Sequence, residues 1–291
     1  MFTDSGTTML QGYAPAVRTD LGVEPSRSDR EGQGGVRSLF VSDIHLGCKH
    51  AQAAEFLDLL ERYEPTHLYI VGDFIDGWKL KRRWRWEPEY DRILQRMMAM
   101  KRSGAKLFYT PGNHDSFLRG FLANFGVIEI RDEFIHEAAD GRRFVVTHGD
   151  KFDRVEQSCQ WLSVVASYAY DVLLTANWWG NRLRGKKHDP YAFCGAIKRR
   201  VKRLVKHISE FEGQLVDNAR GSGCDGIICG HVHAPRIEEI DKVAYLNTGD
   251  WVENCSALVE FDDGSFDLIR RDGKLIDRLP ARSEAPAAIA V

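Results

Sequence analysis

Five short apolar runs in this sequence each stop at a loop that carries aspartate, asparagine or histidine. The first run, Ser38 to Val41, leads into Asp43 and His45, and Gly47 then interrupts it. Side chains two apart on an extended segment point the same way, so the Asp43 carboxylate and the His45 imidazole are expected to converge. Such a pair suits a divalent metal ion, although either residue alone could also cap a turn or form a surface hydrogen bond.

The other four runs repeat this arrangement. Their loops follow residues 67–71, 106–110, 143–147 and 226–230, and carry Asp73, Asn113, His114, Asp115, His148, His231 and His233. Helical patterns over residues 51–64 and 90–98 separate the first three runs, which predicts parallel strands joined by right-handed crossovers. Ligands of such sheets bind beyond the carboxyl ends of the strands, so we expect one shared metal site. The alternative is that each histidine is an ordinary turn or surface residue.

Composition and charge narrow the class of protein. The chain of 291 residues can form one large α/β domain, and its 40 basic and 42 acidic residues give a formal charge of −2. Because no overall positive field attracts nucleic acid, we expect none as a partner. Six cysteines without a Cys-x-x-Cys pair indicate a reducing compartment, and no apolar run approaches the roughly 20 residues of a membrane-spanning helix. These features predict a cytoplasmic protein.

The two ends of the chain and one internal stretch differ from the rest. Residues 1–35 are rich in Gly, Ser, Thr, Pro and charge, and residues 280–291 are rich in Ala and Pro, so we predict a disordered leader and a disordered tail around a domain at 36–279. About eighty residues separate His148 from His231, more than a crossover between strands needs. We predict a helical lid inserted at about 155–220. Three further short strands are predicted over residues 243–247, 257–261 and 266–270.

Two basic stretches are candidates for substrate binding. The predicted lid contains an amphipathic helix at roughly 191–218 with Arg199 and Lys202 on its basic face, which suits an anionic membrane surface or a phosphate-rich ligand. The second stretch follows Asp73 and contains Lys81, Arg82, Arg83 and Trp84; Arg binds phosphate in a fork, and Trp stacks or enters a lipid interface. The alternative for the helix is a solvated lid face that packs on an apolar helix of the lid. For the second stretch it is a solvated loop whose tryptophans pack on the lid.

Taken together, these loops resemble the five motifs of calcineurin-like metallophosphoesterases, in the family's order. The motifs are Asp43-Ile-His45, Gly72-Asp73-Phe-Ile-Asp76, Gly112-Asn113-His114-Asp115, His148-Gly149-Asp150 and Gly230-His231-Val-His233. The resemblance covers about residues 38–271. It implies an α/β fold, a four-layer α/β/β/α sandwich with a helical lid insertion, around a centre of two divalent metals. It implies that the first metal is held by Asp43, His45, Asp73 and His233, and the second by Asp73, Asn113, His148 and His231.

The same resemblance implies a mechanism. A hydroxide held by the two metals is expected to attack phosphorus. His114 resembles the family's general acid for the leaving oxygen, and we expect Asp115 to orient it, as carboxylates do for imidazoles. Asp76 either orients a ligand or caps a loop. Oxygen and nitrogen ligands without thiolate suit manganese, iron or zinc better than copper, and we expect manganese, with iron or zinc as alternatives.

The lid and the basic aromatic stretch resemble the UDP-2,3-diacylglucosamine pyrophosphatases of lipid A biosynthesis, which are peripheral membrane enzymes. Well-known members carry Asn-Arg-Asp where this chain has Asn113-His114-Asp115. We expect cleavage of the pyrophosphate of UDP-2,3-diacylglucosamine or a related lipid-linked nucleotide, by a cytoplasmic protein that contacts the cytoplasmic face of the inner membrane. The alternatives are a phosphodiesterase or phosphomonoesterase for a nucleotide, nucleic acid or phosphoprotein, and a non-catalytic scaffold.

Overall fold

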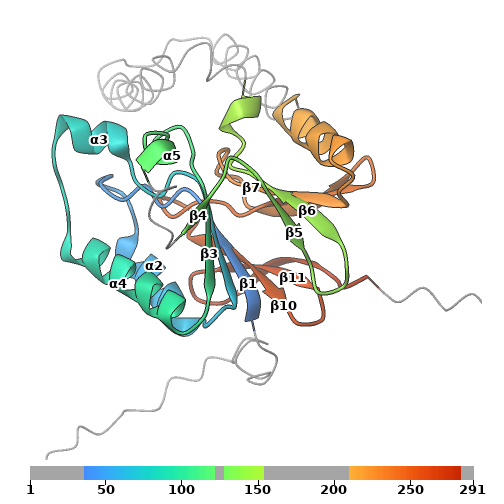
Figure 1. The fold of residues 1–291 in the computed structure, drawn as a ribbon, viewed down its shortest axis with the longest axis horizontal. Helices are drawn as coiled ribbons and strands as arrows, with labels where there is room; N and C mark the ends of the chain where they lie inside the picture. The colour runs from blue at the N-terminus through green and yellow to red at the C-terminus, as the bar shows by residue number, and fades with distance from the viewer. Residues whose placement is uncertain (1–35, 122–127, 154–209, 283–291) are drawn as a thin grey trace, which may run out of the picture.

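A computed structural model describes residues 36–121, 128–153 and 210–282 of the chain (Figure 1). The predicted leader, the predicted lid up to residue 209 and residues 283–291 of the predicted tail lie outside the described residues. Residues 280–282 of the predicted tail are attached to the domain, because the Pro280 carbonyl accepts a hydrogen bond from Arg142 and the Arg282 guanidinium bonds to Asp225.

The first of two sheets has seven strands. Its parallel half consists of β1 (Val36–Val41), β2 (His67–Val71), β3 (Lys106–Thr110) and β4 (Glu129–Ile130). Its antiparallel half consists of β10 (Ser256–Phe261), β11 (Phe266–Arg270) and β12 (Leu275–Leu279). The order across the sheet is β12-β11-β10-β1-β2-β3-β4, so β1 is central and pairs parallel with β2 and antiparallel with β10.

The second sheet has five strands. They are β5 (Phe134–Glu137), β6 (Arg143–Val146), β7 (Gly226–Cys229), β8 (Arg236–Ile240) and β9 (Val243–Asn247). The order is β5-β6-β7-β9-β8. The three inner strands are parallel, and the two edge strands pair with them antiparallel.

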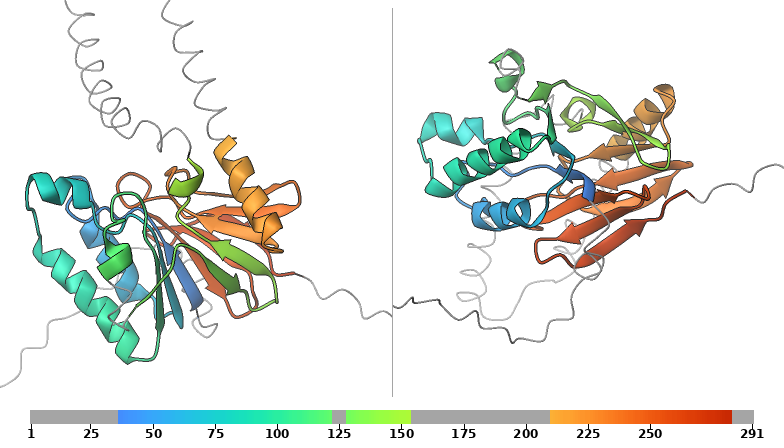
Figure 2. Two further views of the ribbon diagram at one scale, coloured as in Figure 1. Left: turned by 45° about the horizontal axis from the view of Figure 1, so that its top comes forward. Right: turned by 60° about the horizontal axis from the view of Figure 1, so that its bottom comes forward.

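The alternation of side chains along β1 produces three separate cores. Leu39 packs in a core with helices α2 (Ala53–Arg62) and α4 (Pro88–Arg102), whereas Phe40, its neighbour, packs in a second core between the two sheets. A third core joins the outer face of the second sheet to a helix over residues 210–221. The helices therefore cover the outer faces of two stacked sheets, as Figures 1 and 2 show, and the predicted four-layer α/β/β/α sandwich is confirmed.

The helix over residues 210–221 corrects one predicted boundary. We expect the lid to extend to about residue 220, but Phe211, Leu215 and Ala219 are buried against Ile227 and Tyr245 of the second sheet. Residues 210–221 are therefore the fourth layer of the sandwich. The apolar spacing that predicts a helix is correct here, and its assignment to an insertion is wrong.

Several elements carry no clear pattern in the sequence. The predicted strands near the carboxyl end correspond to β9, β10 and β11, but β5, β8 and β12 lie on sheet edges and expose many of their side chains, so they lack a continuous apolar run. A helix α3 (Gly77–Arg82) replaces the loop predicted after Asp73. Its first turn is closed by the Asp76 carboxylate, which accepts a hydrogen bond from the Lys79 backbone N–H at 3.0 Å.

Candidate metal centre

Backbone hydrogen bonds bring the loops after β1 and β2 side by side. The Asp43 N–H donates to the Gly72 carbonyl at 3.0 Å, and the His45 N–H donates to the Asp73 carbonyl at 2.9 Å. On the second sheet, the Gly230 N–H donates to the His148 carbonyl at 3.2 Å, which joins the loops after β6 and β7 in the same way. The carboxyl ends of the strands thus form one continuous set of loops.

Five of the seven predicted metal ligands have a left-handed backbone. The φ angles of Asp43, His45, Asp73, His231 and His233 lie between 50° and 70°. L residues other than glycine adopt this region rarely, and a cluster of such residues is typical of functional sites where the surrounding structure maintains the strain. The shape of these loops is therefore set by the site and not by the local preferences of its residues.

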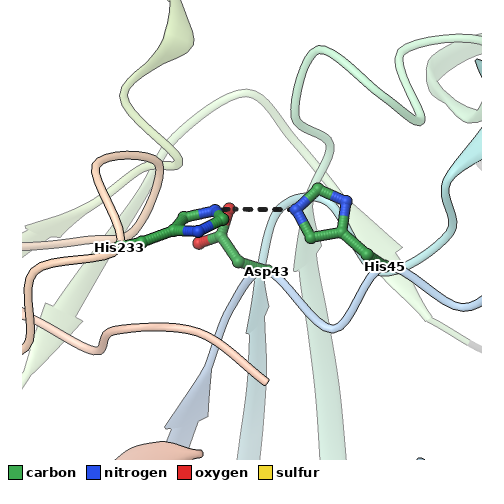
Figure 3. Close-up of side chains that lie close together, drawn as sticks. All are labelled: Asp43, His45 and His233. Atoms are coloured by element: carbon green, nitrogen blue, oxygen red, sulfur yellow. Dashed lines mark hydrogen bonds and ion pairs between the residues drawn. The ribbon is translucent and has the colours of Figure 1, made fainter. Parts of the chain in front are cut away.

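The first group of candidate ligands consists of Asp43, His45 and His233 (Figure 3). The Nε2 atom of His233 lies 3.2 Å from Asp43 Oδ1, and the Nε2 atom of His45 lies 3.8 Å from the same oxygen. Figure 3 shows the two imidazoles entering from opposite sides toward the carboxylate. One ligand atom from each residue lies within 4.8 Å of the others, a spacing compatible with one metal ion.

Asp73 lies at the centre of two further groups. Its Oδ2 atom is 3.9 Å from His45 Nε2, 3.9 Å from His114 Nε2 and 3.5 Å from His148 Nε2. Among the described residues, Asp73 forms one candidate group with His45 and His114 and another with Asp43 and His148. Asp73 is therefore the carboxylate that two of the three candidate groups share.

His148 faces the site with one defined nitrogen. Its Nδ1 lies 2.8 Å from the Val71 carbonyl oxygen, and only an N–H can bond to a carbonyl, so Nδ1 carries the proton. Nε2 is buried and has no hydrogen-bond partner within the described part of the chain. A buried nitrogen that lies 3.5 Å from Asp73 Oδ2 without a hydrogen bond suits a metal ligand, because leaving such an atom unsatisfied is costly.

Asn113 and His231 complete the set of predicted ligands. The backbone beside Asn113 approaches the centre so closely that a Cβ on Gly112 would collide with the side chains of Asp73 and His148. The His231 ring lies next to His148, with 5.2 Å between the ring centroids, but belongs to none of the three candidate groups.

The charges of the site favour cation binding. Burial acts to raise the pKa of Asp43 and of Asp73, but the surrounding imidazoles, chiefly His233 and His148, outweigh burial and hold both carboxyls below their usual range. Burial lowers the pKa of His45, which keeps that imidazole neutral, the form that binds metals. Burial acts to lower the pKa of His148 and of His233 as well, but the nearby Asp73 and Asp43 outweigh it and raise both values. Two buried carboxylates surrounded by imidazoles, without thiolate, fit the binding of divalent cations.

His114 is held on three sides at the entrance of the centre. Its Nδ1 lies 3.2 Å from Asp76 Oδ1, and its backbone N–H donates to Asp73 Oδ1 at 2.9 Å. The Trp78 ring covers one face of the imidazole at a centroid distance of 4.0 Å, and the His45 ring meets it edge-on at 4.7 Å. The carboxylate that orients His114 is therefore Asp76, which also caps α3.

Asp115 has a different role from the predicted one. Its carboxylate accepts hydrogen bonds from the backbone N–H groups of Phe74 and Gly112, each at 2.7 Å, and from the Tyr109 hydroxyl. Burial, together with the nearby Asp73, raises the pKa of Asp115 to about 6. Asp115 fixes the loops after β2 and β3 to each other, and the prediction that it orients His114 is wrong.

The predicted substrate-binding residues lie in α3, directly after it, or outside the described residues. Lys81 and Arg82 end α3, and the Lys81 ammonium lies 5.9 Å from the centre of the Phe117 ring. Trp84 is 73% exposed and stacks on Trp86. Arg83, the C-cap of α3, lies between them and is exposed. Arg199 and Lys202 lie outside the described residues.

Two residues of the site carry no motif in the sequence. Asp153 is buried and its Oδ2 lies 3.1 Å from His231 Nε2, and Trp78 covers His114. Neither follows an apolar run directly. Their roles depend on contacts between loops that the order of residues does not indicate.

Several known proteins are similar to this chain. The chain is 25% identical to the UDP-2,3-diacylglucosamine hydrolase of Vibrio cholerae serotype O1 over 257 residues, which cover 81% of this chain and 98% of that protein. It is 26% identical to the protein of the same name from Shewanella sp. strain ANA-3 over 240 residues, or 79% and 95% of the two chains. The Escherichia coli phosphoesterase Yfce superposes with a TM-score of 0.45 at 15% identity, covering 84% of this chain and 99% of that one.

The family profile of the calcineurin-like phosphoesterases matches residues 36–235, which carry all five loops of the site. With the sandwich, the order of the motifs and the gathered carboxylates and imidazoles, this match is decisive. The chain belongs to the calcineurin-like phosphoesterase family and is a hydrolase of phosphate esters.

Proposed function

We propose that this enzyme hydrolyses the pyrophosphate of UDP-2,3-diacylglucosamine, or of a related lipid-linked nucleotide, at a centre of two divalent cations. The observation that carries the two-cation centre is the position of Asp73, whose Oδ2 is shared by imidazoles from three loops. The substrate class is supported by relatives named UDP-2,3-diacylglucosamine hydrolase, which this chain matches over 95–98% of their length.

Seven side chains would hold the cations. The proposed ligands of the first are Asp43, His45, Asp73 and His233. Those of the second are Asp73, Asn113, His148 and His231. When bound, the cations would activate a water molecule as the nucleophile and neutralise charge on the phosphoryl oxygens. The mixed oxygen and nitrogen donors suit manganese, iron or zinc, and we propose manganese.

His114 is the proposed general acid. With Nδ1 directed at Asp76, the opposite nitrogen, Nε2, faces Asp73 and the centre. The imidazole side chain is 22% exposed, so a leaving oxygen can reach it from solvent. Protonated His114 can therefore donate the Nε2 proton to that oxygen while Asp76 stabilises the imidazolium.

The segment after Asp76 suits an amphiphilic substrate and a membrane surface. It carries basic side chains from α3 next to the exposed ring of Trp84, and the Phe117 ring beside Lys81 is 51% exposed. We propose that this rim, formed by α3, Trp84 and Phe117, binds the pyrophosphate and contacts the cytoplasmic face of the inner membrane. No helix among the described residues is long and apolar enough to cross a membrane.

The substrate is tested by a panel of manganese-supplemented assays that compares UDP-2,3-diacylglucosamine with phosphodiesters and phosphomonoesters. We expect release of UMP from the lipid nucleotide, and none from an Asp73→Ala control. If an aryl phosphodiester is cleaved and no UMP appears, the substrate class is wrong while the hydrolase stands. If the purified protein binds less than one equivalent of manganese, iron or zinc, the two-cation centre is wrong.

The membrane contact is tested by sedimentation with anionic phospholipid vesicles. Trp84→Ser should weaken binding, whereas Leu275→Ser should not, although Leu275 on β12 is also an exposed apolar side chain at 53%. Equal loss in both variants would indicate nonspecific adsorption and contradict a defined membrane-facing rim.

A further inference from the structure

The plane of the His114 ring has to be set by its neighbours. The torsion that rotates an imidazole about its Cβ–Cγ bond has broad minima, so the side chain alone selects no sharp orientation. The contact between His114 Nδ1 and Asp76 Oδ1, at 3.2 Å, holds one edge of the ring. A single hydrogen bond tolerates a range of angles, so this contact restricts the ring plane only loosely.

The Trp78 ring provides a flat surface against which the imidazole lies. The two ring centroids are 4.0 Å apart and the ring planes differ by 31°. The His45 ring meets the same imidazole edge-on, at 4.7 Å and 82°. Rotation about the Cβ–Cγ bond would press an edge of the His114 ring into the face of Trp78, because the two rings are already in van der Waals contact. The stacking contact thus selects the plane in which Nε2 lies 3.9 Å from Asp73 Oδ2.

The start of α3 holds Trp78 against the loop that carries His114. The Gly77 N–H donates to the His114 carbonyl oxygen at 3.2 Å. A Cβ on Gly77 would lie 2.8 Å from that oxygen and 2.5 Å from the Phe117 ring, so a larger residue would force the helix away from the loop. Three consecutive residues, 76–78, therefore contact His114 through a carboxylate, a backbone N–H and a ring.

We propose that Trp78 is a positioning residue for the general acid, and that its ring fixes the plane of the His114 imidazole so that Nε2 stays directed at the leaving oxygen. This inference rests on the role of His114 in the proposed function. General acid catalysis contributes about 10²- to 10⁴-fold to a rate, and a misplacement of about 1 Å can cost about 100-fold. Loss of the ring should therefore lower turnover of substrates whose leaving group needs a proton.

The kinetic test compares phenyl and 4-nitrophenyl phosphodiesters in the presence of manganese, because phenolate needs protonation more than 4-nitrophenolate does. Trp78→Leu keeps an apolar side chain and removes the flat ring. It should lower kcat about 10- to 100-fold for the phenyl ester and less than about threefold for the 4-nitrophenyl ester, with little change in KM. Trp78→Phe, which keeps a flat ring, should restore most of the loss. An equal loss for both esters would overturn the inference.

Trp86→Leu is the matched control. Trp86 is also a partly exposed tryptophan of the same segment, but its ring packs on Tyr90 at 5.3 Å and its indole N–H donates to Asp91 at 2.9 Å. Any loss of kcat in this variant should be the same for both esters. A loss selective for the phenyl ester would mean that general destabilisation produces the effect, and would also overturn the inference.

A double-mutant cycle tests whether Trp78 acts through His114. In a His114→Ala background, Trp78→Leu should cause no further loss of kcat for the phenyl ester, because no imidazole remains to be oriented. A further loss by the same factor as in the single variant would show that Trp78 acts elsewhere.

The stacking contact can also be observed without turnover. In Zn²⁺-loaded protein, which is diamagnetic, NMR of ¹³C-labelled histidine reports the ring protons of His114, whose signals are identified by their absence in His114→Ala. Protons over the face of an aromatic ring are shielded, so these signals should move downfield in Trp78→Leu and move less in Trp78→Phe. Unchanged signals in Trp78→Leu would mean that the rings are not stacked in solution, and would contradict the proposed contact.

The outcomes separate this inference from the function on which it rests. If His114→Ala loses kcat selectively for the phenyl ester and Trp78→Leu does not, the inference fails alone. If Trp78→Leu raises KM for both esters and leaves kcat unchanged, Trp78 binds substrate and the inference again fails alone. If His114→Ala itself shows no dependence on the leaving group, the proposed general acid is wrong, and the inference fails with it.

Discussion

Replacing Asp76 by Asn should isolate the electrostatic part of general acid catalysis. Asn caps helices as well as Asp, so the bond from the Lys79 N–H and the start of α3 should persist. The substitution changes the partner of His114 Nδ1, which in the unmodified protein is a charged carboxylate oxygen at 3.2 Å. A hydrogen bond to a charged group contributes about 1.5–3 kcal/mol. If the Asp76 carboxylate mainly stabilises the protonated His114, its replacement should lower kcat by about 10- to 150-fold.

The assay uses aryl phosphodiesters whose leaving phenols differ in acidity. A good leaving group such as 4-nitrophenolate needs little protonation, whereas phenolate needs more. Asp76→Asn and His114→Ala should therefore lower kcat more for phenyl than for 4-nitrophenyl esters. Metal content, measured by elemental analysis, should remain close to that of wild type in both variants.

Two results would refute this reasoning. An equal loss of kcat across the whole series would mean that Asp76 and His114 do not assist the leaving oxygen. Loss of metal in His114→Ala would mean that His114 is a ligand, as its 3.9 Å distance from Asp73 Oδ2 permits. Lys79→Ala, which alters an exposed side chain near Asp76 and leaves the backbone cap intact, is the control for local disturbance.

Further substitutions test the structure of the site and of the sheets that support it. Asp73→Ala should release both cations, because the carboxylate is shared; elemental analysis that finds one equivalent retained would argue against a bridge. Gly112→Ala should lower the free energy of unfolding by roughly 1–3 kcal/mol, because the added Cβ collides with Asp73 and His148. Gly213→Ala, at a helical position where the added Cβ meets nothing within 4 Å, should raise the free energy of unfolding by about 0.5–1 kcal/mol. Urea titrations in which the two variants rank the other way would contradict this packing. Glu260→Gln should cost about 1.5–3 kcal/mol at pH 7. Burial acts to raise the pKa of Glu260, but the hydrogen bond to His136 outweighs burial, and the pKa in the folded protein lies below the usual 4.5. The ionised carboxylate therefore stabilises the fold fully above pH 4.5, and this stabilisation is lost as the pH falls through the pKa of the folded protein. The stability difference between wild type and this variant should shrink in acid, and a constant difference would exclude the charge as its source.

The residues at strand ends follow from the sequence because one local rule governs them. An apolar run that stops at a glycine or a polar residue places the next side chains at the sheet edge, and this holds for Asp43, Asp73 and His148. The parallel order of the first strands then brings these ends together. The gathering of candidate ligands is therefore predictable without knowledge of the loops, whereas the four layers are implied by the resemblance to the family.

The partners of these residues depend on turns that have no such rule. Asp115 is next to His114 in the chain, but its side chain turns back to the Phe74 and Gly112 N–H groups, and the more distant Asp76 faces the imidazole. Asp153 contacts His231 from another loop, 78 positions away in the chain. Edge strands such as β8 and β12 are difficult to predict for a related reason. Side chains on both of their faces are exposed, so the sequence lacks the alternation of apolar and polar residues that marks a strand.

The left-handed backbone of five candidate ligands has a consequence for the protein without its cations. If each such residue stores about 1 kcal/mol, the five together hold a sizeable part of the roughly 5–15 kcal/mol that keeps a domain folded. Cations that bind only the folded chain would offset this strain energy, and the offset would increase with their concentration. A cell short of metal would therefore contain a molecule that is easier to unfold and degrade, and supply of the ion would set the amount of enzyme as well as its rate.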